Sequence, residues 1–143
     1  MSKTSNTKRS TESYFGDVIS AYTRAQAIDD GVLVEAGTLV KENVFKWPVT
    51  LTSAAWADCV AWSDDDSEKQ VYQDQAGRLW DVLYMASCEI RNSNGSGEQM
   101  LFQLYRVPRD GKALKAELVT LKLIVGPGDQ GEPVITILLP DED

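Results

Sequence analysis

The side chains that could do chemistry in this sequence are carboxylates, arginines and two cysteines, because the chain has no histidine. Glu89 could serve as a general base, while Arg106 and Arg109 could hold a phosphate group between them. Such a set would suit cleavage of RNA. The missing histidine removes the residue that most often acts as the general acid, so the set is incomplete.

The absence of histidine excludes several classes of site. A Ser-His-Asp triad, a Cys-His pair and a His-ligated metal are all impossible. The net charge is −8; residues 1–16 hold three cations and one anion, which gives +2 and leaves −10 for the rest. An acidic body disfavours contact with nucleic-acid backbone. We therefore expect a non-enzymatic protein that does not bind DNA directly.

A run of acidic residues follows Trp62. It consists of Asp64, Asp65, Asp66 and Glu68. A calcium loop of the EF-hand type needs glycine at its sixth position, where this chain has Lys69. The run is therefore predicted to be a solvated acidic loop without a metal, and a candidate surface for a basic protein partner.

Residues 106–115 hold the main cationic cluster of the chain body. Arg106 and Arg109 are joined there by Lys112 and Lys115. Cations often protect the edge of a sheet from unwanted pairing. The alternative is that Arg106 and Arg109 contact a phosphate or an acidic partner.

Residues 126–131 match the G-x-G-x-x-G pattern of dinucleotide sites. That site needs a helix to begin at the loop, whereas a strand-like run begins here at Pro133. We expect a hairpin loop and no cofactor. The thiols of Cys59 and Cys88 are expected to be reduced and buried, and the four tryptophans (Trp47, Trp56, Trp62, Trp80) to pack in the core.

The first half of the chain has helical signals. Residues 17–30 have helical spacing and stop before Gly31, where a left-handed residue often ends a helix. Residues 32–35 should be extended, and residues 38–42 could form one or two helical turns. Thr52 is a good N-cap for a helix over residues 53–62.

Residues 69–91 are ambiguous. Their apolar positions fit a helix, but every second residue from Trp80 to Ile90 also fits one face of a strand. The preceding Asp74 and Gly77 are typical of a hairpin turn. We therefore predict a hairpin of residues 70–74 and 78–91.

The second half consists of strands and turns. Residues 99–107, 117–125 and 133–139 are predicted strands. The predicted fold class is α+β: short N-terminal helices pack on one face of a roughly five-stranded antiparallel meander. Residues 17–140 would form one domain after a disordered polar tail at 1–16. Residues 1–13 lack the apolar core of a signal peptide, which predicts a cytoplasmic protein.

Several strings resemble one family of bacterial proteins. They are residues 21–35 (AYTRAQAIDDGVLVE), 56–62 (WADCVAW), 77–83 (GRLWDVL) and 118–140 (LVTLKLIVGPGDQGEPVITILLP). These strings are similar to the DUF6573 family, whose members are common on plasmids and prophages. The resemblance implies an accessory protein of a mobile element, and it assigns no catalytic residue.

Four functions remain open on this basis, one of them a structural or regulatory partner with no anti-defence role. An acidic accessory protein could inhibit a host defence system, in an anti-CRISPR or anti-restriction role, by covering a basic nucleic-acid-binding surface of a host protein. A ribonuclease of the barnase or RelE type is an alternative, because helices also precede an antiparallel sheet in those folds. The third is a module that holds a small ligand near Trp80 and Tyr84.

Overall fold

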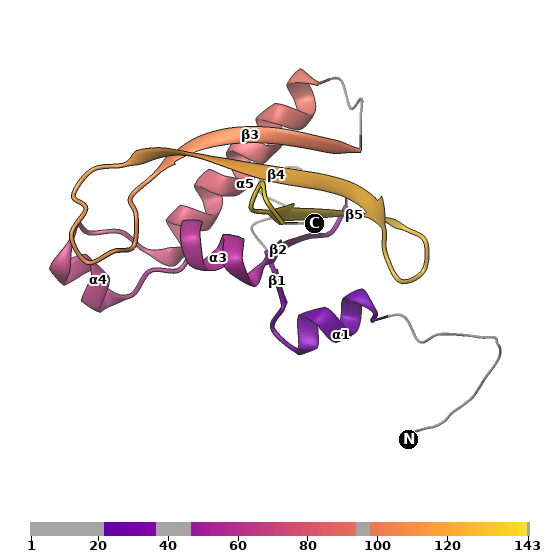
Figure 1. Cartoon of the computed structure of the whole chain (residues 1–143), viewed down its shortest axis with the longest axis horizontal. Coiled ribbons are helices and arrows are strands. Elements are labelled where there is room, and N and C mark those ends of the chain that lie inside the picture. The colour runs from indigo at the N-terminus through magenta and orange to yellow at the C-terminus, as the bar shows by residue number, and fades with distance from the viewer. Residues whose placement is uncertain (1–21, 37–46, 94–97, 143) are drawn as a thin grey trace.

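The computed structural model describes residues 22–36, 47–93 and 98–142, which form an α+β fold as predicted (Figure 1). The predicted tail at 1–16, the start of the first predicted helix and the helical turns at 38–42 lie outside the described residues. Within the described ranges, no helix has the length and apolar composition needed to cross a membrane.

One five-stranded sheet organises the molecule. Its spatial order is β1-β2-β5-β4-β3, so β1 and β3 are its edges. The strands are β1 (Leu33–Glu35), β2 (Val49–Thr52), β3 (Gln99–Arg106), β4 (Glu117–Pro127) and β5 (Pro133–Leu138). The last three confirm the predicted strands of the second half.

The sheet is mixed, so the prediction of a purely antiparallel meander is wrong. β3, β4 and β5 follow one another in antiparallel order, but β2 lies parallel to β5, with Leu51 opposite Ile137. The sequence does not reveal β2 because it has only four residues and the first three are buried. A run buried on both faces lacks the alternation that marks a strand.

The predicted hairpin at residues 70–91 is wrong, because α5 (Gln75–Asn92) is an 18-residue helix. Asp74 and Gly77 form its N-cap: the Asp74 carboxylate accepts a hydrogen bond from the Gly77 N–H at 2.6 Å. The buried side chains of α5 have helical spacing (Arg78, Leu79, Val82, Leu83, Ala86, Ser87).

The short helix α1 (Arg24–Asp29) begins in a capping box at Thr23, so residues 22 and 23 are not helical, although the predicted helix spans residues 17–30. Its end before Gly31, at φ 80°, is as predicted. The Asp129 carboxylate accepts hydrogen bonds from the N–H groups of Arg24 and Ala25 at 2.8 and 3.0 Å. Asp129 lies in the loop between β4 and β5, so the G-x-G-x-x-G segment is a hairpin loop, as expected, and it binds a helix end.

Among the described residues, two further helices precede α5. α3 (Ser53–Cys59) begins at the predicted N-cap Thr52, whose side chain accepts a hydrogen bond from the Ala55 N–H at 3.2 Å. α4 (Asp64–Lys69) replaces the predicted acidic loop, since Ser63 caps it and three aspartates lie in its first turn. Negative charge at this position is favourable because the helix N-terminus is electropositive.

The core lies between the sheet and two helices. Buried side chains of α3 and α5 belong to the same cluster as Leu51, Leu121 and Ile137 of the sheet. Of the four tryptophans, Trp62 is buried and Trp56 packs against this core, but Trp47 and Trp80 are exposed, so the core prediction is wrong for these two. Both cysteines are free thiols; Cys59 is buried and Cys88 half-buried.

Candidate functional site

The three residues of the ribonuclease hypothesis do not come together. The Arg78 side chain donates a hydrogen bond to the Val107 carbonyl at 2.9 Å, so the start of α5 lies beside the end of β3, where Arg106 is found. Glu89 follows Arg78 by 11 residues on α5. That is about 16 Å along a helix axis, which separates the proposed base from the proposed phosphate clamp.

Both candidate arginines are paired with carboxylates. Arg106 binds Asp58 at 3.0 Å, and Arg109 binds Asp66 at 2.7 Å. The pKa of Asp66 is lowered, first by the Ser63 N–H and also by Arg109. The cationic cluster and the acidic run, which look separate in the sequence, therefore neutralise one another in part.

The rest of the acidic run lies on the surface of α4. Asp65 forms an exposed ion pair with Lys69 at 3.0 Å, one turn along the helix. Asp64 and Glu68 are exposed. In the described part of the chain, no group of three or more Cys, Asp and Glu residues is placed to hold a metal ion.

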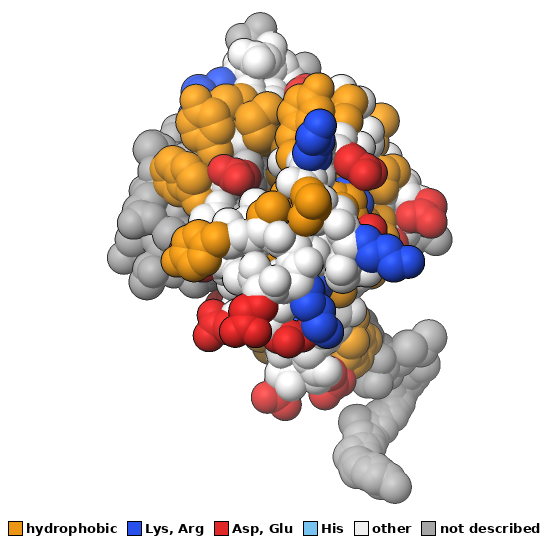
Figure 2. All heavy atoms as spheres, turned by 90° about the vertical axis from the view of Figure 1, so that its left-hand side faces the viewer, with side chains coloured by type: hydrophobic (Ala, Val, Ile, Leu, Met, Phe, Trp, Pro, Cys, Tyr) orange, Lys and Arg blue, Asp and Glu red, His pale blue; other side chains and the backbone are white. Residues whose placement is uncertain are grey.

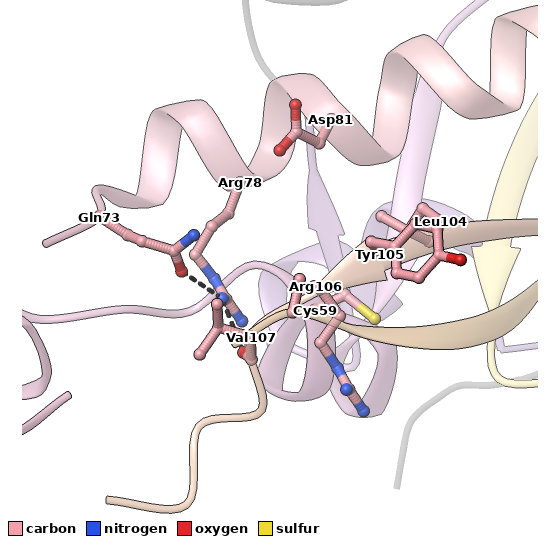
Figure 3. Close-up of a pocket in the computed structure, with 9 residues that line it drawn as sticks. Cys59, Gln73, Arg78, Asp81, Leu104, Tyr105, Arg106 and Val107 are labelled. Carbon is pink, nitrogen blue, oxygen red and sulfur yellow. Dashed lines mark hydrogen bonds between the residues drawn. The ribbon is translucent and has the colours of Figure 1, made fainter. Parts of the chain in front are cut away.

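Arg78 is a buried junction that sequence analysis does not identify. Its side chain donates to the Val107 carbonyl at 2.9 Å and to Gln73 at 2.8 Å (Figure 3). It also donates to the Val60 carbonyl at 3.1 Å. The guanidinium also lies 4.6 Å from the centre of the Trp62 ring, a cation–π contact. Arg78 thus ties the end of α3, the start of α5 and the end of β3 together.

Three adjoining hollows meet at Asp81, one turn beyond Arg78 on α5. An inner cavity of about 150 Å³, drawn in Figure 3, is bordered by Asp81, Cys59 and the two arginines Arg78 and Arg106. Two outer hollows of about 480 and 330 Å³ lie on either side of Asp81. We call the three together the Asp81 cleft.

Aromatic side chains surround Asp81 in both outer hollows. Tyr84 and Tyr105 border the larger one, and Trp80 and Tyr72 border the smaller one. Tyr105 is 67% exposed and Tyr72 is 85% exposed. Exposed apolar groups of this size that adjoin one another usually mark a binding surface. Figure 2 views the end of the molecule near α4 and shows hydrophobic side chains over the upper part of this face, with single charged side chains between them, and a group of acidic side chains below.

The two aromatic residues of α5 form a fixed pair. The rings of Trp80 and Tyr84 stack with centroids 6.1 Å apart. They are one helical turn apart, and the carboxylate of Asp81 lies between them in sequence. Stacking restricts both rings, so a ligand would lose less conformational entropy on binding to them.

The charge state of the cleft depends on Asp81. Burial raises the pKa of its carboxyl group, and the nearby Arg78 partly opposes that shift. Arg78 and Arg106 are already engaged with other groups, whereas no described group hydrogen-bonds to Asp81. The cleft therefore presents an unpartnered carboxylate framed by aromatic rings.

The cysteine in the cleft is not a nucleophile. The pKa of the Cys59 thiol is raised to about 12, mainly by burial and also by the nearby Asp58 carboxylate. The thiol is therefore protonated at neutral pH, and a protonated thiol is a poor nucleophile. The described side chains of the cleft thus offer recognition by shape and charge.

Only part of this cleft is predicted by the sequence. Trp80 and Tyr84 are predicted to lie near a small ligand, but Asp81, Arg78 and Tyr105 are missed. A helical reading of residues 75–92 would place Trp80, Asp81 and Tyr84 outside the apolar stripe, and exposed aromatic residues would then have been the signal.

Comparison with known proteins places the chain in a family. The model of DUF6573, described as a family of unknown function, matches residues 12–143. No curated protein and no solved structure matches the chain. Because the match covers nearly all of the sequence, the chain belongs to the DUF6573 family.

Proposed function

We propose that this protein is a non-enzymatic binding protein that binds another protein through the Asp81 cleft. The observation that supports this is the unpartnered Asp81 carboxylate between exposed aromatic rings on both sides. Aromatic rings and a carboxylate together attract cations, through cation–π contacts and direct charge pairing. The partner therefore presents basic side chains.

The setting of this function is part of the proposal. The protein acts in the cytoplasm of its bacterial host, as an accessory protein of a plasmid or prophage. It inhibits a host defence protein, in an anti-CRISPR or anti-restriction role, by occupying a surface whose Lys and Arg otherwise hold nucleic acid. The net charge of −8 supports this version because acidic and basic surfaces associate rapidly.

A small-ligand module is the second candidate, and the size of the cleft supports it. The larger outer hollow, of about 480 Å³, lies within the range of typical small-molecule sites. A ribonuclease is less well supported, because Glu89 lies three helical turns from the end of α5 that adjoins Arg106.

The test compares two charge reversals, Asp81→Arg in the cleft and Glu68→Arg on α4. The immobilised protein is exposed to a lysate of a host that carries defence systems, and retained proteins are quantified by mass spectrometry. We expect a stoichiometric basic partner that Asp81→Arg loses and Glu68→Arg retains. Loss with Glu68→Arg alone would assign binding to α4 and contradict the proposal.

Two controls complete this test. Asp29→Arg changes an exposed carboxylate on α1, away from the cleft, and should retain the partner. A thermal shift of the wild-type protein with a panel of nucleotides tests the small-ligand alternative. A shift that Asp81→Arg abolishes, without any retained protein, would favour the ligand module instead.

A further inference from the structure

The edge strand β3 has unusually little protection along its length. It has eight residues, and its only charged residue is Arg106 at the end. The Arg106 side chain forms an ion pair with Asp58, and Arg109, which follows the strand, forms one with Asp66. Both cations are therefore engaged with carboxylates of other elements. Edge strands are usually short, charged or interrupted by proline, because their free N–H and C=O groups can pair with another chain.

The Asp81 cleft follows this edge. Its larger outer hollow is bordered by three consecutive residues of β3 (Gln103, Leu104, Tyr105), by Asp81, Tyr84 and Met85 of α5, and by Leu118 of β4, which pairs with Tyr105. Side chains of consecutive strand residues point to opposite faces, so a hollow that touches all three borders the backbone edge of the strand. Among the described residues, no strand pairs with this edge of β3, so the cleft is a groove between an open strand edge and a helix.

We propose that the partner binds as an extended segment that adds a sixth strand to β3 and places an arginine side chain against Asp81. This inference rests on the proposed function, since it specifies how the partner occupies the cleft. Addition of a strand to a sheet edge supplies affinity through main-chain hydrogen bonds, and side-chain pockets supply specificity. Here Asp81 and its aromatic neighbours form such a pocket.

Charge complementarity determines the side chain that enters this pocket. The two cations of the inner cavity are engaged with other groups: Arg78 binds two carbonyls and Gln73 through Nε and Nη1, while its buried Nη2 has no hydrogen-bond partner, and Arg106 binds Asp58. Among the described residues of the cleft, Asp81 forms no hydrogen bond or ion pair, and the nearby Arg78 only partly offsets the effect of burial on its carboxyl group. An acidic ligand would be repelled by this carboxylate.

Arginine suits the pocket better than lysine. Its planar guanidinium can pair with both oxygens of a carboxylate and lie flat on aromatic rings at the same time. Tyr84 and Tyr105 border the hollow beside Asp81 and supply such rings. A lysine ammonium is more strongly hydrated and would be bound more weakly.

The experiment follows the backbone resonances of the ¹⁵N-labelled full chain during titration with synthetic peptides. The probe is a blocked heptapeptide of alternating Val and Thr with Arg at its centre, and matched peptides have Lys, norleucine or Glu there. We expect the Arg peptide to shift the backbone amide resonances of Asp81, Tyr84 and residues 103–105. We expect Glu or norleucine to weaken its binding by about tenfold or more.

Backbone N-methylation distinguishes strand addition from binding by side chains alone. In an added strand, the N–H groups of alternate residues point toward the sheet edge. One of two peptides with complementary N-methylation patterns should therefore bind, and the other should not. Equal binding of both peptides, or shifts that avoid residues 103–105, would overturn the proposal.

Protein variants complete the test. Asp81→Asn should reduce binding of the Arg peptide about tenfold, and Glu68→Gln on α4 should leave it unchanged. A β3-mediated dimer of the chain, detected by sedimentation, would mean that a second copy occupies the edge, and would overturn the proposal. If the lysate partner is lost with Asp81→Arg but the peptides fail, the proposed function stands and only strand addition fails.

Discussion

Asp81 is a residue whose charge costs the fold stability. Burial raises its pKa in the folded state above the value in the unfolded chain. Between these two pKa values the folded state binds more protons, so stability falls as pH rises through that window. The cost is present above this window, which fits the proposed role of this carboxylate in binding.

We predict that Asp81→Asn raises the melting temperature at neutral pH, and that the difference disappears below about pH 4, where the unfolded Asp is also protonated. Thermal unfolding at several pH values measures this. Asp66→Asn is the matched control with the opposite sign, because hydrogen bonds from Ser63 lower the pKa of Asp66. That variant should lose stability at neutral pH, and parallel behaviour of the two variants would contradict the assignment.

Arg78 contributes through the geometry of its guanidinium. A lysine keeps the charge but has one ammonium group, which cannot reach three acceptors on three segments. We predict that Arg78→Lys lowers the free energy of unfolding by about 2–4 kcal/mol, measured by urea denaturation. Arg91→Lys, on the exposed end of α5, should change it by less than about 0.5 kcal/mol.

At the scale of elements, α5 depends on its N-cap. Asp74→Ala removes the acceptor of the Gly77 N–H and should lower the free energy of unfolding by about 1 kcal/mol. Asp74→Ser keeps an acceptor and should restore most of it. The urea midpoint should change while its m-value stays constant, and an unchanged midpoint in Asp74→Ala would contradict the role of the cap.

The elements also show what sequence patterns can predict. The strands of the second half alternate between apolar and polar residues or have strong aliphatic runs, and all three are confirmed. The predicted helix start at Thr52 and the predicted helix end at Gly31 are confirmed, because capping depends on local chemistry. These signals require no knowledge of distant contacts.

The errors have physical causes. Residues 78–91 satisfy both periods, and only the tertiary structure shows that Trp80 and Tyr84 are exposed while Val82 and Leu83 are buried. Asp and Gly are common both in hairpin turns and at helix N-termini, so Asp74 and Gly77 do not distinguish the two structures. Tyr105 borders the cleft because β3 lies at the edge of the sheet. The periodicity of a sequence does not show the order in which strands pair, so this position could not be predicted.

At the scale of the whole molecule, the sheet depends on β5. Ile137 is fully buried and lies opposite both Leu51 of β2 and Leu123 of β4. Ile137→Ala should lower the free energy of unfolding by about 2–5 kcal/mol. Leu101→Ala on the exposed face of β3 is the control and should cost less than about 0.5 kcal/mol. If both variants lost a similar free energy of unfolding, the stability of the sheet would not depend specially on β5.

The position of β5 also determines when the protein can finish folding during its synthesis. Among the described strands, β1 and β2 reach the other strands only through β5, which is made after them all. A growing chain can close the β3–β4 hairpin early, but the apolar residues of β2 have no parallel neighbour until residues 133–138 leave the ribosome. For most of its synthesis, the nascent chain therefore exposes β2, and a chaperone that holds extended apolar segments would act at that stage.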